Sequence, residues 1–479
     1  MPHAITGKFR SRKRQLGQAI YLGLAAIIFL SLMTYAAFNI SQMTHAKAQT
    51  MNAADAGAYT IATVVARDLN FMAYTNRAMA ANHAVIGQLV SLASLSQMIY
   101  LAADDLEELE KLSWIPYVGP IFEAIGSAFG YVKDAIENII LPGLQMIANV
   151  QNALIKVISI MQLGVHGATA IDAKNAVEKV IKANDPELEW ATTSGVAGGL
   201  TTASNIKSIV ETFFGEFSGQ VSDSDDTGLG RMREVVNLSR DGFTIERNWV
   251  PLPSVSTPVL KLSSKWLFHG GTQLSSDNKT WVGVDGAEVK YKQRSGIKWK
   301  TKYLRWWLTG EVAGSNGAND WKKLSHGDLS SDGHKKAYNN RKHEMEDTYD
   351  GIQSYWELSE FKAGDRSGDS PAYVVLVYKP VQSSDASNVT RTENAMQVFQ
   401  TDADNPFHLK EGRPRIYGVA ASQVYFRRPA KNDNDPTAGQ LPSTLYPKGT
   451  YATLFAPYWQ PRLTDLPAGM AAALMAVGD

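Results

Sequence analysis

The first third of the chain has the hydrophobic pattern of long helices. Residues 19–38 carry no charge, and at about 1.5 Å per residue a helix of this length spans roughly 30 Å, the thickness of a bilayer hydrocarbon core. Further on, apolar residues recur at helical spacing, and no proline occurs between Pro2 and Pro116. The pattern predicts a helical trunk from Gly17 to Lys111 that begins in a membrane.

Two more helices are predicted after the trunk. Proline and glycine at 114–120 and at 141–143 predict breaks, which leaves one helix at 121–140 and another from Leu144 to Ala183. The last helix carries an apolar stripe. We interpret it as ordinary helical core, with a partner-binding face as the alternative; it consists of Ile147, Val150, Leu154, Val157, Ile158, Met161 and Val165.

After Arg231 the periodicity changes from helical to alternating. Aromatic and β-branched residues alternate with polar ones between clusters of Gly, Pro, Asn and Asp, a pattern typical of strands. The chain is therefore predicted to be α+β, with a helical stalk that carries a β-rich head, and with a further helix at 337–347. The predicted strands are residues 243–250, 265–268, 279–284, 289–292, 298–308, 373–378, 396–399 and 415–426.

These elements divide the chain into six segments. A basic cytoplasmic segment (1–17) precedes the transmembrane helix (18–39), and a helical stalk or hairpin region (40–190) follows. A Gly/Ser/Thr-rich hinge with an acidic loop (191–230) leads to the β-rich domain (231–463) and a tail (464–479).

Charge sets the predicted orientation of the membrane helix. Five basic residues lie before it, at positions 8, 10, 12, 13 and 14, and no acidic residue precedes Asp55. The excess of positive charge predicts a cytoplasmic N-terminus and a single-pass inner-membrane protein with its bulk in the periplasm or at the cell surface. A cleaved signal peptide, with a site at 46–48, is the competing interpretation.

Composition narrows the chemistry. The net charge is +0 and gives no reason to expect nucleic acid as a partner. Because there is no cysteine, disulfides, thiol nucleophiles and cysteine zinc sites are excluded. His343 and Glu344 begin like a zinc-protease helix, but position 347 is Asp rather than the second His. No nucleophile, base and orienting acid can be joined into a triad, so no enzyme activity is predicted.

An acidic loop offers a weak metal site. Asp223, Asp225 and Glu234 take positions 1, 3 and 12 of a calcium-loop spacing, with Gly228 at position 6. The ordinary alternative is a solvated acidic loop without a metal, and no other cofactor is predicted.

Tryptophan is concentrated in the β-rich region. Nine of the 11 tryptophans lie between Trp249 and Trp459. They could stack on the sugar rings of a surface glycan or fill a β core. Trp306 and Trp307 are the best candidates for an exposed ring, since adjacent strand residues point to opposite faces.

Four segments resemble the TadE/TadG-like family of Tad (Flp-type) pilus proteins. The first two are Gly17-Gln18-Ala19 before the apolar helix and the small-residue stretch from Met51 to Tyr59 after it. The others are residues 66–79 and 456–463. The resemblance implies a membrane partner, other pilus-assembly or pilin subunits as partners, and lateral helix packing through Gly17, Ala54, Asp55 and Ala58.

Two departures limit what the resemblance implies. Pilins of this class carry a glutamate at the fifth position after the cleaved glycine, where this chain has Leu22, so repeated subunit stacking is not implied. No Asp-x-Ser-x-Ser metal motif is present either. The expectation is an accessory, minor pilin-like protein that acts by contacts, with a membrane-anchored glycan-binding protein or hydrolase as the alternative.

Overall fold

The structure is a computed structural model of the whole chain. It describes residues 13–107, 119–190, 217–222, 226–249, 255–257, 262–295, 298–314, 339–341, 345–359, 369–380, 415–427 and 452–466.

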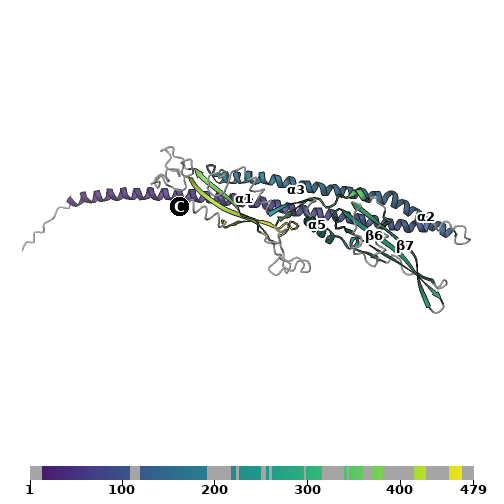
Figure 1. Cartoon of the computed structure of the whole chain (residues 1–479). Coiled ribbons are helices and arrows are strands. Elements are labelled where there is room, and N and C mark those ends of the chain that lie inside the picture. Colours follow the sequence, from purple (N-terminus) through teal and green to yellow (C-terminus); the bar gives the residue numbers. More distant parts are fainter. Residues whose placement is uncertain are drawn as a thin grey trace, which may run out of the picture.

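One helix runs the length of the molecule (Figure 1). Helix α1 extends from Lys13 to Glu107 without interruption. The predicted trunk is confirmed across residues 53–101, and glycines at 57 and 87 do not break it. Gly87 instead admits a close neighbour, because a Cβ there would stand 2.6 Å from the ring of Trp281.

A second helical layer returns along α1. It consists of α2 (Gly119–Ala135), a short π-helix η2 (Ile136–Ile140) and α3 (Leu141–Asn184). The break predicted at 141–143 is wrong, since the helix passes through Pro142. In the π-turn, the N–H of Leu141 bonds to the carbonyl of Ile136, five residues back. This wider turn lies where a proline ring would clash with an ordinary α-helix.

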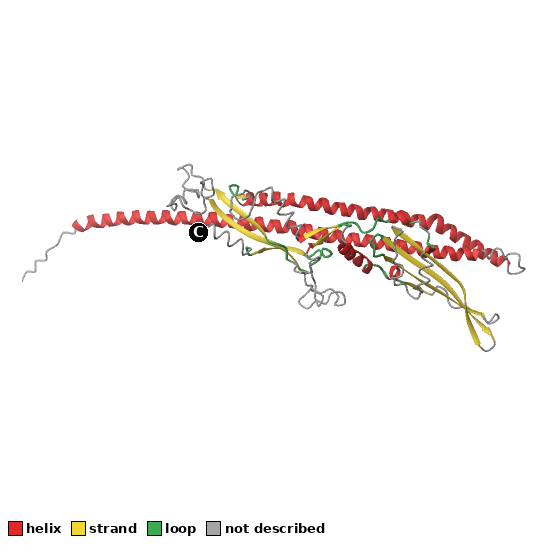
Figure 2. Cartoon of the chain, in the orientation of Figure 1, coloured by secondary structure: helices red, strands yellow, loops and turns green. Residues whose placement is uncertain are grey.

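The strands form three antiparallel groups (Figure 2). A sheet in the order β1-β9-β10-β11 uses Glu189–Trp190, Tyr373–Pro380, Arg415–Phe426 and Trp459–Thr464. A ribbon pairs β2 (Ser218–Val221) with β8 (Tyr355–Leu358). The third sheet follows the order β3-β5-β6-β7, with β4 also paired to β5; its strands are Arg247–Trp249, Leu262–Leu274, Thr280–Ser295, Lys298–Gly314 and, for β4, Val255–Thr257.

A tight turn sets the register of the β5–β6 hairpin. Between β5 and β6, the carboxylate of Asp277 accepts hydrogen bonds from the backbone N–H groups of Lys279 and Thr280. Asn278 takes a φ of 61°, a left-handed conformation that asparagine tolerates better than most residues. The turn places Leu274 opposite Trp281, and both side chains are buried.

Helices and strands share their hydrophobic cores. One core joins alanines of α1, Val177 and Ile181 of α3, and Val375 and Val377 of β9. A second joins Ile86 and Val90 of α1 with Ile155 of α3 and Trp281 of β6. The α+β class is confirmed, but the sheets lie along α1 instead of forming a head at the end of a stalk (Figure 1).

Most of the predicted strands are present, with shifted ends. The prediction for 415–426 matches β10, and those at 279–284 and 289–292 are parts of the single strand β6. The segment 396–399 lies outside the described residues, as do 337–338 and 342–344 of the helix predicted at 337–347. Strands β1, β2, β4, β8 and β11 were not predicted. The described residues also form three short helices: α5 (Asp226–Leu238), α6 (Gly242–Ile245) and the 3-10 turn η4 (Glu346–Thr348).

Candidate functional site

Helix α1 has two parts that differ in burial. From Ala19 to His45 the described side chains, which exclude that of Asn39, are exposed or half-buried; Leu22 and Phe29 are 72% and 59% exposed. The first buried residue is Ala46, at 2% exposure. We call 19–45 the projecting segment and 46–107 the enclosed segment. Figure 1 shows the projecting segment extending beyond the sheets and α3.

Three hydroxyls of the projecting segment are satisfied within the helix. The hydroxyls of Ser31, Thr34 and Thr44 each donate to the carbonyl four residues earlier, at 2.8 Å. Such bonding hides a hydroxyl from an apolar solvent at little cost. Residues 19–38 of the segment therefore expose a mostly apolar surface, which suits a hydrocarbon environment.

Two helices of the described chain are long and apolar enough to cross a membrane. They span Ala19–Asp105 and Gly126–Asn184, and the apolar window of the first has no buried residue, whereas 22% of the second window is buried. Buried core helices of soluble proteins can be equally apolar. Burial, rather than hydropathy, therefore distinguishes the projecting segment from the rest of α1 and from α3.

The structure separates the residues that the sequence grouped as an anchor and packing site. Gly17 lies in α1, within the part whose side chains are not described, and Leu22 lies on the projecting segment. Ala54 and Ala58 lie on the enclosed segment, both 0% exposed, and Asp55 between them is half-buried. The group is therefore divided between two environments.

The prediction that Ala54 and Ala58 form a face open to another subunit is wrong. Both belong to the core that α1 forms with α3 and β9. Ser422 of β10 donates its hydroxyl to the carbonyl of Ala58, and a Cβ on Gly418 would stand 2.4 Å from the carbonyl of Thr50. The small residues let a strand of this same chain approach α1 closely.

A buried polar cluster ties α1 to α3. The Asp68 carboxylate lies 2.8 Å from Nδ1 of His166 and accepts a hydrogen bond of 3.1 Å from Thr169. The imidazole packs against the ring of Trp356, with centroids 4.2 Å apart. Carboxylate and imidazole resemble part of a catalytic triad, but both oxygens of Asp68 and one face of the ring are engaged by the fold. The arrangement fixes the position of α3 along α1.

Two asparagines of α1 hold segments from the end of the chain. Asn70 donates to the carbonyl of Trp459 and accepts from its N–H, at 2.9 and 3.0 Å. Asn76 donates to the carbonyls of Trp356 and Leu454, both at 2.8 Å. The segments 66–79 and 456–463, which carry part of the family resemblance, therefore lie side by side.

A histidine and a tyrosine meet in the second core. The hydroxyl of Tyr349 lies 3.0 Å from Nδ1 of His83, and their rings form an edge-on contact. Burial lowers the pKa of His83 to about 3 and raises the pKa of Tyr349 well above its ordinary value. Both groups are neutral at physiological pH and enclosed by apolar side chains, which suits a structural role.

Buried ion pairs join the remaining elements. Arg247 of β3 binds Asp285 of β6 through two contacts of 2.6 and 2.8 Å, and both side chains are almost fully buried. Burial raises the pKa of Asp285, and the charge of Arg247 opposes that rise. Arg231 of α5 lies 3.1 Å from Glu357 of β8. None of these groups lines either hollow described below.

The calcium-loop spacing does not correspond to a loop throughout. Glu234 is exposed on α5, which begins at Asp226, so the chain between them is helical where a calcium loop would be irregular. Asp223 and Asp225 lie outside the described residues. The described residues hold no group of three or more His, Asp or Glu placed for a metal. Calcium binding by this region stays a prediction.

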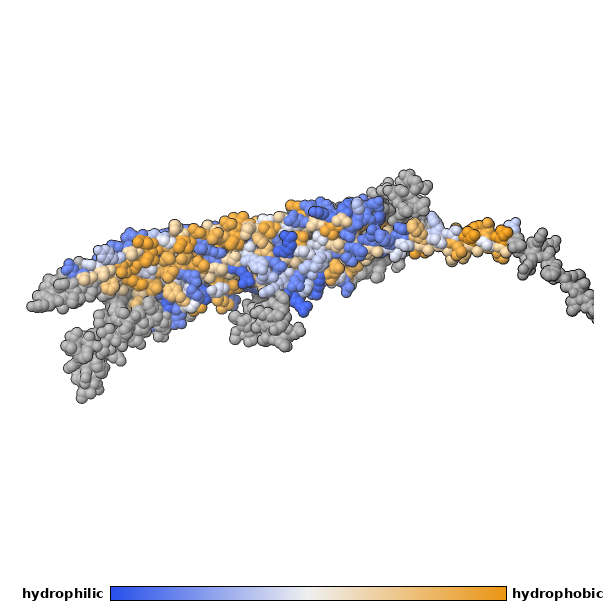
Figure 3. Space-filling view, turned by 180° about the vertical axis from the view of Figure 1, so that it is seen from behind, coloured by the Kyte–Doolittle hydropathy of each residue, from blue (hydrophilic) through white to orange (hydrophobic). Residues whose placement is uncertain are grey.

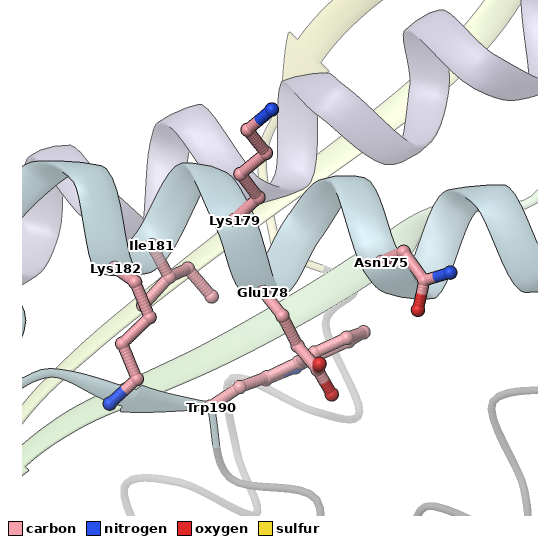
Figure 4. A pocket seen from close by; sticks show the side chains of 6 residues that line it. All are labelled: Asn175, Glu178, Lys179, Ile181, Lys182 and Trp190. Carbon is pink, nitrogen blue, oxygen red and sulfur yellow. The ribbon is translucent and has the colours of Figure 1, made fainter.

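Two shallow hollows occur on the surface of the described chain. One, of about 450 Å³, lies between α1 and α5, and three of its nine lining residues are alanines. The other, of about 360 Å³, lies between the end of α3 and β1 (Figure 4). In Figure 4, Glu178 extends toward Trp190 while Lys179 points away from it. This hollow is lined by four polar residues of α3, and both hollows are open to solvent, whereas a small-molecule site is usually an enclosed and mostly apolar cleft.

Three tryptophans of the β-rich region are core residues. Trp281, Trp356 and Trp459 are 0%, 7% and 2% exposed. Trp306 and Trp307 lie on β7, in a part whose side chains are not described. For the three described rings, core packing accounts for the choice of tryptophan.

Comparison of the chain with protein-family models, with curated proteins and with solved structures found no match.

Proposed function

We propose that this protein is a membrane-anchored accessory component of Tad-type pilus assembly or surface attachment, and that it acts through protein contacts without turnover of a substrate. The observation that carries the proposal is the change of environment along α1. One continuous helix has an apolar, exposed segment at 19–38, a short continuation to residue 45 with no buried residue among those described, and a segment from Ala46 onward that packs against α3 and the sheets. A helix of this kind can hold the folded part of the chain at a fixed distance from a bilayer. We call that folded part, from Ala46 onward, the body.

The dimensions of the projecting segment support anchoring. Residues 19–38 cover roughly 30 Å of helix, which matches a hydrocarbon core. Residues 39–45 add about 10 Å, enough to cross the interfacial region before the body begins at Ala46. The basic residues before position 15 then lie on the cytoplasmic side, and the body lies outside the cytoplasm.

The pilus assignment rests on the resemblance and on one feature of the fold. The segments 66–79 and 456–463 both carry the resemblance, and the Asn70–Trp459 hydrogen bonds bring them together. The polar clusters inside the body are buried and hydrogen-bonded, which supports a role in binding rather than in catalysis.

A charge in the projecting segment tests anchoring. Leu30→Arg places a charge near the middle of the proposed span, and we expect the protein to leave the membrane fraction. Leu92→Arg is the matched control, because Leu92 is an exposed leucine of the same helix in the enclosed segment. Equal membrane retention of both variants would contradict anchoring by residues 19–38.

Topology and function need separate measurements. Protease added to intact spheroplasts should digest the body, and its protection would place the body in the cytoplasm. Deletion of the whole coding sequence should then reduce piliation or surface attachment, and the wild-type chain should restore it while Leu30→Arg does not. Unchanged piliation and attachment in the deletion strain would refute the pilus role even if the topology is right.

A further inference from the structure

The face of α3 that points away from α1 is apolar and regularly spaced. Most of the stripe interpreted from the sequence as core is on the outside: Val150, Leu154 and Val157 are 54%, 43% and 58% exposed. The core interpretation is wrong for these residues and holds only for Ile158, which is half-buried against the second core, and the half-buried Val165. The buried face of α3 is instead formed by residues that include Ala148, Ile155 and Gln162. Figure 3 shows hydrophobic residues gathered where α2 and α3 run.

The spacing of this face is that of a coiled coil. Its residues follow one another at alternating intervals of three and four, the repeat that keeps one seam facing a partner helix. We call this set the outward seam: Ile140, Gly143, Ile147, Val150, Leu154, Val157, Met161, Gly164, Ala168 and Ile171.

The face avoids charge. Between residues 138 and 171 the only charged side chain is that of Lys156. Its ammonium lies 2.8 Å from the carboxylate of Asp350, on the body of the same chain. Exposed helices normally carry charged residues on the face opposite the core. A second apolar face without charge indicates that another surface covers it.

We propose that the outward seam pairs with the outward seam of a second copy of this chain, in parallel. The orientation rests on the proposed anchoring, because two copies held in one membrane by their projecting segments must point the same way. In a parallel pair each seam residue meets its own counterpart. Leu154 and Met161 then form large layers, whereas Gly143 and Gly164 let the two helices approach closely.

The area is sufficient for such a pair. The seam runs about 47 Å along α3, and a face about 10 Å wide buries roughly 500 Å² on each copy. That total reaches the roughly 1,000 Å² expected of a specific interface. Met146, Ile160 and Leu163 flank the seam, are all more than half exposed and widen it further.

A lipid surface fits the seam less well than a helix does. Helices that lie on membranes carry lysine or arginine beside their apolar face, and Lys156 of this region is already paired. Because α3 runs alongside α1 (Figure 1), a span formed by the projecting segment also keeps α3 from lying flat on the bilayer. The opposite face of α3 is bonded to the body through Gln162 and His166, so lipid cannot surround the helix.

Single cysteines provide the test, because the natural chain has none. Full-length Val157→Cys and Val150→Cys should form disulfide-linked dimers in native membranes under mild oxidation. Asn149→Cys is the control, since Asn149 is exposed on α3 outside the seam. Adding Leu154→Asp to Val157→Cys should reduce the dimer by on the order of tenfold or more, because the pair would bury two carboxylates without partners.

Other results would overturn the proposal. Equal crosslinking of Asn149→Cys would mean random collision, and crosslinking of Val157→Cys to a different protein would mean another partner. Preferred pairing of Val150→Cys with Met161→Cys would mean an antiparallel pair.

A polarity-sensitive dye on Val157→Cys should report a dry environment only in nanodiscs that hold two copies. A dry signal in nanodiscs with one copy would mean lipid contact. These assays do not depend on piliation, so the dimer and the pilus role can fail separately.

Discussion

Helices α1 and α3 are both long and apolar, yet their surroundings differ. The enclosed segment of α1 is packed between α3 and the sheets and uses small residues where strands approach it. Helix α3 is packed on one side only, with Ile155 fully buried and its neighbour Leu154 43% exposed. The comparison teaches that apolar periodicity identifies helical faces without identifying what covers each face. On α3, the hydrogen-bonding residues Asn152, Gln162 and Thr169 lie on the face that this chain covers itself.

The largest effect should come from the buried face of α3. Ile155→Ala removes a fully buried side chain from the second core, and the cavity should lower the free energy of unfolding by about 2–5 kcal/mol. Leu154→Ala, one residue away, should change it by about 0.5 kcal/mol or less in monomeric protein. Urea unfolding in detergent measures both. Similar losses for the two variants would mean that both faces of α3 are covered within one chain.

The enclosed segment of α1 should resist enlargement. Ala58→Leu adds volume where Ser422 of β10 contacts the helix backbone, and overpacking should cost about 1–3 kcal/mol. Ala37→Leu is the control, because Ala37 is exposed on the projecting segment. Thermal unfolding should therefore separate the two variants. If Ala58→Leu is as stable as the wild type, α1 and β10 are not held as closely as the structure indicates.

Much of this arrangement could be predicted from the sequence, and its failures share a cause. The uninterrupted helix from 53 to 101 and strand β10 follow from local periodicity. The assignment of Val150 and Leu154 to a core failed because periodicity does not say which of two apolar faces turns inward. Ala54 and Ala58 were assigned to a partner because the strand that covers them lies more than 350 residues away. Pro142 signalled a break, and the π-turn before it has no clear sequence signature.

The second core should give the fold a pH dependence. Because burial lowers the pKa of His83 to about 3, its imidazole stays unprotonated in the native protein, whereas in the unfolded chain it binds a proton below about pH 6.5. The free energy of unfolding should therefore fall as the pH drops from about 6.5 toward 3, by about 1.4 kcal/mol per pH unit from this residue.

A histidine variant isolates that contribution. His83→Gln keeps a polar partner for Tyr349 and should make the decline shallower, whereas the exposed His45→Gln should leave it unchanged. Urea unfolding between about pH 7 and pH 5 is the measurement. An identical slope in wild type and His83→Gln would show that water reaches this part of the core.

The smallest effect should come from the one charge on the middle of α3. Lys156 and Asp350 are each about half exposed, at 48% and 47%. The hydrogen bond from Lys156 is the largest cause that lowers the pKa of Asp350, followed by that from Asn152. Water and salt screen an exposed pair of this kind, so Lys156→Met should change the free energy of unfolding by about 1 kcal/mol or less. The difference in free energy of unfolding between the wild type and Lys156→Met should shrink further in high salt. A loss of several kcal/mol would mean that this pair, rather than the buried face around Ile155, holds α3 against the body. The contrast drawn between the buried and exposed faces of α3 would then be wrong.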